Sequence, residues 1–129
     1  MTESVRCILL AEDDRLLRKA AEATLKRQGY RVVLAVDGEE ALQVARAERP
    51  DLILLDLIMP KRQGFEVLRE LKGSPDTAGI PVIILSNLGQ ERDIQQAMDL
   101  GAVAYYVKAS LSLDGLVKHV EAALERGRD

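Results

Sequence analysis

Five short apolar runs recur along the chain and are separated by longer, more polar stretches. The runs are rich in Val, Ile, Leu and Tyr, and they do not alternate strictly between apolar and polar residues. Such continuous runs are typical of strands in a parallel sheet that is covered on both faces. The runs are VRCILLA (5–11), RVVLAV (31–36), DLILL (51–55), IPVIILS (80–86) and AVAYYVK (102–108). The pattern therefore predicts five buried strands.

The stretches that follow the runs have helical periodicity. The second stretch begins at DGEE, where Asp37 can cap a helix and Glu40 occupies the capping-box position. The last places apolar residues on one face, and we expect His119, which lies off that face, to be exposed. The predicted helices are about 14–28, from 38 until Pro50, about 64–72, about 90–100, and from Ser112 onward. Strands that alternate with helices predict an α/β domain with helices on both faces of a parallel sheet.

Length and composition narrow the possible functions. A chain of 129 residues with 47% hydrophobic and 30% charged residues is typical of one soluble globular domain. The net charge of −3 and the 3% aromatic content argue against direct nucleic-acid binding by bulk positive charge or base stacking. We find no signal peptide and no apolar run near the ~20 residues of a membrane span. We therefore expect a single domain over 1–129, located in the cytoplasm and not bound to a membrane.

Polar side chains follow four of the five apolar runs, at the point where each predicted strand ends. Ligands of open parallel sheets bind beyond the carboxyl ends of the strands, so these side chains should meet at one edge. They are Glu12, Asp13 and Asp14 after the first run, Asp56 after the third, Ser86 and Asn87 after the fourth, and Lys108 after the fifth. The same edge thus receives carboxylates, a hydroxyl and an ammonium group.

These groups have complementary uses if Asp56 accepts a phosphoryl group. Neighbouring carboxylates can hold Mg²⁺, which neutralises charge that would repel an anionic donor. Lys108 can pair with Asp56 and then with a phosphate oxygen, and Ser86 can donate its hydroxyl to another oxygen. Each feature alone has an ordinary explanation, since acids favour helix starts and a single Ser or Lys after a strand is usually incidental. Asp56 in its apolar run is harder to explain that way, because a buried carboxylate needs donors.

The motifs ILLAEDD, LLDLIMPKRQG, VIILSN and YYVKAS resemble those of one known family over residues 5 to 126. The family comprises the receiver domains of two-component response regulators, such as the bacterial chemotaxis receiver. The resemblance implies a flavodoxin-like, doubly wound sheet of five parallel strands in the order 2-1-3-4-5, with five helices.

The resemblance also implies a role for each site residue. Asp56 would be the phosphoacceptor, and Mg²⁺ (or Mn²⁺) would be held by Asp13, Asp56 and the backbone carbonyl of Ile58, with Glu12 acting through water. Ser86 would be the switch hydroxyl, Lys108 the lysine that assists phosphorylation, and Tyr105 the aromatic residue whose rotamer follows it. Asp14 would lie outside the acidic pair and start a helix.

Three departures from the family pattern change the expectations. Where the family usually has Lys-Pro with a cis peptide, this chain has Lys108-Ala109. Both isomers stay open, and we favour cis because lysine placement is demanding, although a non-proline cis bond costs roughly 2.5–4 kcal/mol. Asn87 replaces a small residue and would narrow donor access, add an amide hydrogen bond or be an exposed bystander. Ile58 and Leu88 are apolar where the family tunes hydrolysis, so we predict a long-lived phosphoryl group.

The resulting expectation is a signalling domain that catalyses its own phosphorylation and slow dephosphorylation. A histidine kinase or histidine phosphotransfer protein would supply the phosphoryl group. The face formed by the helix at 90–100, the strand at 102–108 and the last helix would then bind a downstream protein or a second copy. One alternative is a receiver that has lost phosphorylation and acts as a scaffold. Another is a Mg²⁺-dependent phosphohydrolase with an aspartyl-phosphate intermediate, which would need a second acid where Ile58 stands.

Overall fold

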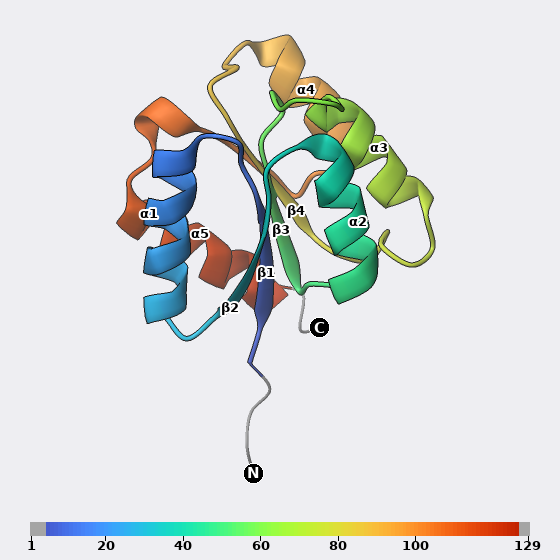
Figure 1. Cartoon of the computed structure of the whole chain (residues 1–129). Helices are drawn as coiled ribbons and strands as arrows, with labels where there is room; N and C mark the ends of the chain where they lie inside the picture. The colour runs from blue at the N-terminus through green and yellow to red at the C-terminus, as the bar shows by residue number, and fades with distance from the viewer. Residues whose placement is uncertain (1–4, 127–129) are drawn as a thin grey trace.

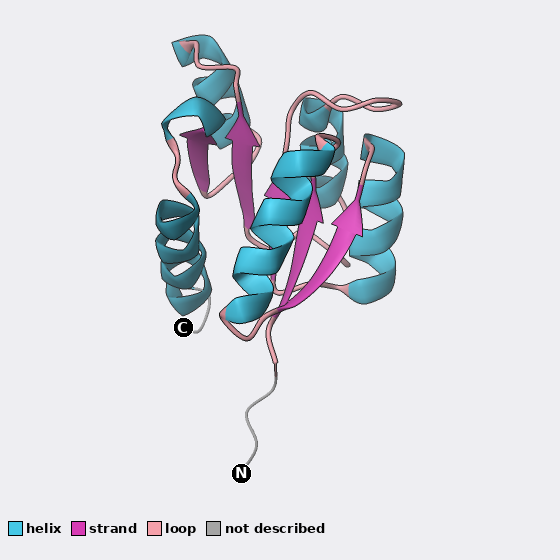
Figure 2. Ribbon diagram, turned by 60° about the vertical axis from the view of Figure 1, so that its left-hand side comes forward, coloured by secondary structure: helices cyan, strands magenta, loops and turns pink. Residues whose placement is uncertain are grey.

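A five-stranded parallel sheet lies between two layers of helices (Figures 1 and 2). The structure, a computed structural model, describes residues 5–126. The strand order β2-β1-β3-β4-β5 confirms the expected topology. The strands are β1 (Cys7–Ala11), β2 (Arg31–Ala35), β3 (Leu52–Leu55), β4 (Val82–Ser86) and β5 (Ala104–Val107). The helices are α1 (Arg15–Arg27), α2 (Gly38–Glu48), α3 (Gly64–Gly73), α4 (Glu91–Asp99), the short 3-10 helix η1 (Lys108–Ser110) and α5 (Leu113–Arg126).

Two apolar cores form because successive side chains of a strand point to opposite faces of the sheet. Leu9 of β1 enters the core beneath α2, α3 and α4, whereas its neighbour Ile8 enters the core beneath α1 and α5. The helices contribute buried residues such as Leu42 to the first core and Leu25 to the second. Figure 1 shows α1 and α5 on one side of the sheet and α2 and α3 on the other. The strands are therefore covered on both faces, as their continuous apolar runs predicted.

The starts of α1 and α2 follow the predicted capping chemistry. Asp14 caps α1, and its side chain accepts hydrogen bonds from the backbone N–H groups of Leu16 and Leu17. Asp37 caps α2 by accepting from the N–H of Glu40, and the Glu40 carboxylate accepts in return from the N–H of Val36. In the usual capping box the return bond comes from the N–H of the cap residue itself, whereas here it comes from the residue before the cap. Both caps fix the direction in which the chain leaves the carboxyl ends of β1 and β2.

Two glycines, at the starts of α2 and α3, allow very close contact with the loop between β3 and α3. A Cβ atom at Gly38 would lie 2.4 Å from the backbone oxygen of Arg62. One at Gly64 would lie 2.4 Å from the Cα atom of Leu57 and 2.6 Å from the carbonyl oxygen of Asp56. Only glycine fits such approaches without displacing backbone, so these positions hold the 57–63 loop against α2 and over the end of β3.

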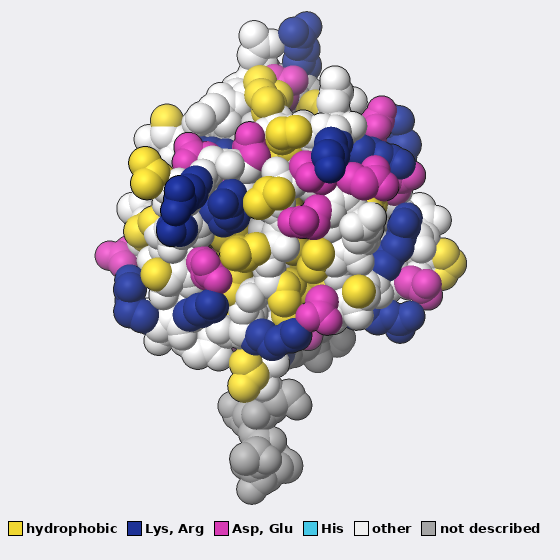
Figure 3. Space-filling model, viewed as in Figure 1, with side chains coloured by type: hydrophobic (Ala, Val, Ile, Leu, Met, Phe, Trp, Pro, Cys, Tyr) yellow, Lys and Arg dark blue, Asp and Glu magenta, His cyan; other side chains and the backbone are white. Residues whose placement is uncertain are grey.

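The exterior shows one departure from expectation. His119 is half-buried rather than exposed, because its ring stacks on Tyr106 of β5. Elsewhere, basic and acidic side chains are interspersed over the face shown in Figure 3. None of the helices within residues 5–126 combines the length and apolar character needed to cross a membrane.

Candidate functional site

The register of β1 and β3 brings two acidic segments together at the carboxyl edge of the sheet. Ala11 pairs with Leu55, so the chain leaves both strands at the same level. The backbone N–H of Asp56 donates to the carbonyl of Ala11 at 3.1 Å, which extends the pairing one residue further. Glu12 and Asp56 thus begin neighbouring loops side by side. The strand order, rather than closeness in sequence, creates the site.

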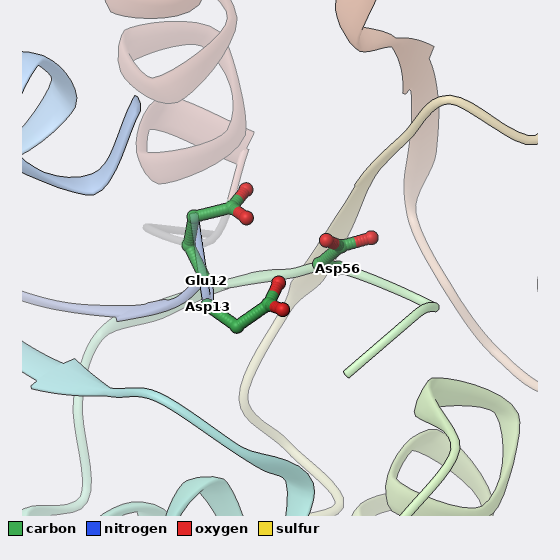
Figure 4. Close-up of side chains that lie close together, drawn as sticks. All are labelled: Glu12, Asp13 and Asp56. Carbon is green, nitrogen blue, oxygen red and sulfur yellow. The ribbon is translucent and has the colours of Figure 1, made fainter. Parts of the chain in front are cut away.

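Three carboxylates gather at this point. Glu12, Asp13 and Asp56 each offer an oxygen atom, and these oxygens lie within 4.8 Å of one another. Figure 4 shows the carboxylates of Glu12 and Asp13 on the side that faces Asp56. Glu12 and Asp56 are only 2% and 4% exposed, whereas Asp13 is open to solvent. Carboxylates this close repel one another unless a positive group lies near them, and an all-oxygen donor set with one exposed member is of a kind that suits Mg²⁺.

Lys108 supplies positive charge to the two buried acids. Its Nζ atom lies 2.7 Å from Oδ2 of Asp56 and 2.6 Å from Oε1 of Glu12. The pair with Asp56 confirms the expected contact. The pair with Glu12 was not foreseen, because Glu12 was assigned to water-mediated metal binding. Burial acts to lower the pKa of Lys108, but hydrogen bonds to Asp56 and Glu12 outweigh burial and raise that pKa above its ordinary value.

The preference for a cis bond between Lys108 and Ala109 was wrong. Every peptide bond in residues 5–126 is trans, and Lys108 still contacts Asp56. The chain turns after β5 through the 3-10 helix η1, which begins at Lys108 itself. This turn directs the lysine side chain to the site without the missing proline. The argument for backbone strain at this bond is therefore removed.

Ser86 and Tyr105 meet at the loop that follows β4. Ser86 is fully buried at the end of the strand, and its Oγ atom accepts a hydrogen bond from the N–H of Leu88 at 3.2 Å. The Tyr105 hydroxyl donates to the carbonyl of the same Leu88. Burial raises the pKa of Tyr105, so its hydroxyl keeps the proton that this bond uses. Both predicted switch residues therefore hold one residue of the β4–α4 loop.

The predicted tuning residues border the site. The backbone N–H of Ile58 donates to Oδ1 of Asp56 at 3.1 Å, while the Ile58 side chain is 58% exposed. Leu88 is half-buried, and Asn87 beside it is exposed. Ile58 and Leu88 also line a shared hollow together with Phe65. Apart from Gln63, the residues that line this hollow are apolar.

Arg18 is a site residue that the sequence reasoning missed. One nitrogen of its guanidinium group donates to the backbone carbonyls of Glu12 at 3.0 Å and Asp13 at 3.2 Å. Its position four residues after the Asp14 cap was a usable signal, because long side chains in a helix point back toward the helix N-terminus.

Arg62 anchors the loop that follows Asp56, and it too was missed. Its guanidinium pairs with Glu39 of α2 at 3.2 Å and with Glu70 of α3. Lys61 lies 3.6 Å from Asp37, and the N–H of Gly38 donates to the carbonyl of Pro60 at 3.2 Å. These contacts tie the loop that follows Asp56 to the N-terminus of α2.

The chain matches a known family over nearly its full length. The profile of the family described as "Response regulator receiver domain" matches residues 8–121. Response regulator RR06 of Streptococcus pneumoniae is 41% identical over 119 residues, which cover 92% of this chain and 53% of that protein. The chain spans between 15% and 59% of the length of eight curated relatives that it matches.

Solved structures agree with this match. A CheY-like receiver domain protein from Methanospirillum hungatei superposes with a TM-score of 0.90 at 23% identity, covering 96% of this chain and 97% of that one. This likeness concerns the fold alone. The signal receiver domain of a signal transduction histidine kinase from Syntrophus aciditrophicus superposes with a TM-score of 0.87 at 32% identity, covering 96% of this chain and 93% of that one.

Proposed function

Because this chain belongs to the response regulator receiver domain family of two-component signalling, we propose that it accepts a phosphoryl group on Asp56. The donor would be a phosphohistidine of a sensor histidine kinase or histidine phosphotransfer protein. The observation that carries the proposal is the buried Asp56 carboxylate beside Glu12 and Asp13, with Lys108 on its Oδ2 atom. We further propose that residues 1–129 act as one receiver domain.

Asp56 would be the nucleophile. Its carboxylate oxygen attacks the phosphorus atom of the donor, the new P–O bond forms as the P–N bond breaks, and the donor imidazole leaves with the bonding electrons. The Lys108 ammonium then pairs with a phosphoryl oxygen in place of a carboxylate oxygen. Ser86 donates its hydroxyl to a second phosphoryl oxygen. Each of these groups already lies at the carboxyl edge of the sheet.

The acidic cluster would hold the divalent cation. Asp13 and Asp56 supply carboxylate oxygens, the backbone of Ile58 a carbonyl oxygen, and Glu12 an indirect contact through water. Bound Mg²⁺ (or Mn²⁺) supplies the positive charge that offsets the acids and the phosphoryl oxygens. The exposed position of Asp13 next to the two buried acids supports this assignment, since it leaves an open approach.

The switch would begin at the β4–α4 loop. When Ser86 turns its hydroxyl toward the phosphoryl group, its bond from the N–H of Leu88 is lost, and the loop is then held by Tyr105 through the Leu88 carbonyl. Movement of Tyr105 would pass the change to the face of α4, β5 and α5. That face would bind a downstream protein or a second copy of the chain, with no direct contact to nucleic acid.

Incubation with Mg²⁺ and a small phosphodonor, followed by intact mass measurement, tests the proposal. We expect one phosphoryl adduct on the wild type and none on Asp56→Asn. An unmodified wild type would indicate the phosphorylation-impaired scaffold instead. Sustained release of inorganic phosphate without an adduct would indicate a phosphohydrolase, which the apolar side chain of Ile58 argues against.

A further inference from the structure

The Arg18 side chain holds the backbone of the two adjacent acids, Glu12 and Asp13. Its guanidinium donates to the carbonyls of both Glu12 and Asp13, at 3.0 Å and 3.2 Å. We propose that Arg18 is a positioning residue that fixes the direction of the Asp13 side chain and so sets the affinity of the site for a divalent cation. This role rests on the proposed function, because it concerns the cation used in the phosphorylation of Asp56.

Asp13 depends on its backbone for its position more than Glu12 does. The Glu12 carboxylate is held by Lys108 and by the N–H of Asp14. The Asp13 carboxylate, in contrast, is exposed and accepts no hydrogen bond from any residue between 5 and 126. Its Cα–Cβ direction is therefore set by the two peptide planes on either side of it. Those planes carry the carbonyls that Arg18 binds.

Arg18 is well placed to restrain both planes. Asp14 caps α1, and the N–H of Arg18 donates to the Asp14 carbonyl at 2.9 Å, so the arginine lies in the first turn of the helix. Its half-buried side chain runs back past the cap to residues five and six positions earlier. Both bonds come from one guanidinium nitrogen, Nη1, so a single group restrains the two planes together.

The charge of Arg18 and its positioning role predict opposite changes in metal affinity when Arg18 is removed. A positive group close to a cation site repels the cation, so loss of that charge alone should strengthen metal binding. Loss of a group that holds the Asp13 side chain in place should weaken metal binding, because the metal must then order that side chain. The direction of the change therefore separates the two roles without reference to phosphorylation.

The experiment measures Mg²⁺ affinity of the unphosphorylated protein by calorimetry or by NMR titration of backbone amides. Arg18→Met should weaken Mg²⁺ binding roughly tenfold. Arg15→Met is the matched control, because it removes the same charge from the same helix, and the Arg15 side chain is exposed and makes no hydrogen bond or ion pair within residues 5–126. We expect its affinity to equal or slightly exceed that of the wild type. Arg18→Lys should recover part of the loss.

An Arg18→Met affinity equal to or tighter than that of Arg15→Met would overturn this role. Circular dichroism and thermal melts without Mg²⁺ establish that each variant is folded, and Arg18→Lys provides the comparison if Arg18→Met is not. A wild type that binds no Mg²⁺ would overturn the proposed function and this role together. A wild type that binds Mg²⁺ with no difference among the variants would overturn this role alone.

Discussion

The ring of Tyr106 in β5 stacks on the ring of His119 in α5, with centroids 3.8 Å apart and planes 19° apart. The pair joins the edge strand to the last helix on the face that we propose as the output surface. Stacked aromatic pairs contribute about 0.5–1.5 kcal/mol beyond the burial of their area. The contact thus stabilises the relative position of β5 and α5.

Tyr106→Ala should lower the free energy of unfolding by about 1–2 kcal/mol, because it removes the stacked ring. Tyr106→Phe keeps the ring and should remain within about 0.5 kcal/mol of the wild type. Urea unfolding of both variants, with His119→Ala and the double variant to complete a cycle, measures the coupling between the rings. Additive effects of the two alanine substitutions would show that the stack contributes no stability.

Lys108→Met should destabilise the protein by about 3 kcal/mol in the presence of a chelator, because it leaves the buried Glu12 and Asp56 without their counter-ion. Added Mg²⁺ should recover part of that loss by neutralising the same carboxylates. The measurement is urea unfolding with EDTA and with Mg²⁺. Equal destabilisation in both media would contradict the shared role of lysine and cation.

Gly38→Ala should destabilise the protein by about 1–3 kcal/mol, because the added Cβ would lie 2.4 Å from the carbonyl oxygen of Arg62. Gly73→Ala is the matched control, since a Cβ there meets nothing within 4 Å and Gly73 ends a helix. We expect that control to be neutral or slightly stabilising in thermal unfolding. A Gly38→Ala protein as stable as the control would show that the loop yields easily.

Leu88→Glu and Ile58→Asn should each shorten the lifetime of the phosphoryl group by severalfold. A polar side chain at either position can orient an attacking water, which the present apolar residues cannot do. The rate of loss of the adduct by intact mass, after removal of the donor, measures the effect. Leu88→Met and Ile58→Val are the apolar controls, and rates that match them would remove the link between apolarity and lifetime.

Cys7 should make stability fall at alkaline pH. Burial raises the pKa of its thiol, so the folded state favours the protonated form. The stabilisation is fully present below the unfolded-state pKa of about 8.5 and is lost as the pH rises through the higher folded-state pKa. Urea unfolding between pH 7 and pH 10 should show a smaller loss for Cys7→Ala than for the wild type. Parallel pH profiles would exclude this contribution.

The sequence predicted the fold and the edge of the sheet where the site lies, because both follow from periodicity and from the topology of parallel strands. The continuous apolar runs were correctly interpreted as strands covered on both faces. The acids that follow β1 and β3 meet because those strands pair directly. Even the contact of Lys108 with Asp56 could be expected from strand ends alone.

The features that were not predicted depend on side-chain direction and on local turns, which the periodicity of the sequence does not encode. The trans bond after Lys108 lies in a 3-10 turn that begins at that residue. Arg18 was not among the predicted site residues, yet its side chain turns back to the acidic loop. His119 was expected in solvent, but the crossing of α5 over β5 places Tyr106 against it.

The two loops beside Asp56 are restrained to very different degrees. On the α2 side, the loop is clamped by Arg62, by the Pro60–Gly38 hydrogen bond and by the tight fit at Gly38. On the α4 side, Leu88 is held by the hydroxyl groups of Ser86 and Tyr105, and both can rotate. The loop that follows β3 is thus firmly held, whereas the loop that follows β4 is held mainly by two side chains. If Asp56 is phosphorylated as proposed, we therefore expect the resulting displacement to spread through the β4–α4 loop and to leave the loop against α2 in place.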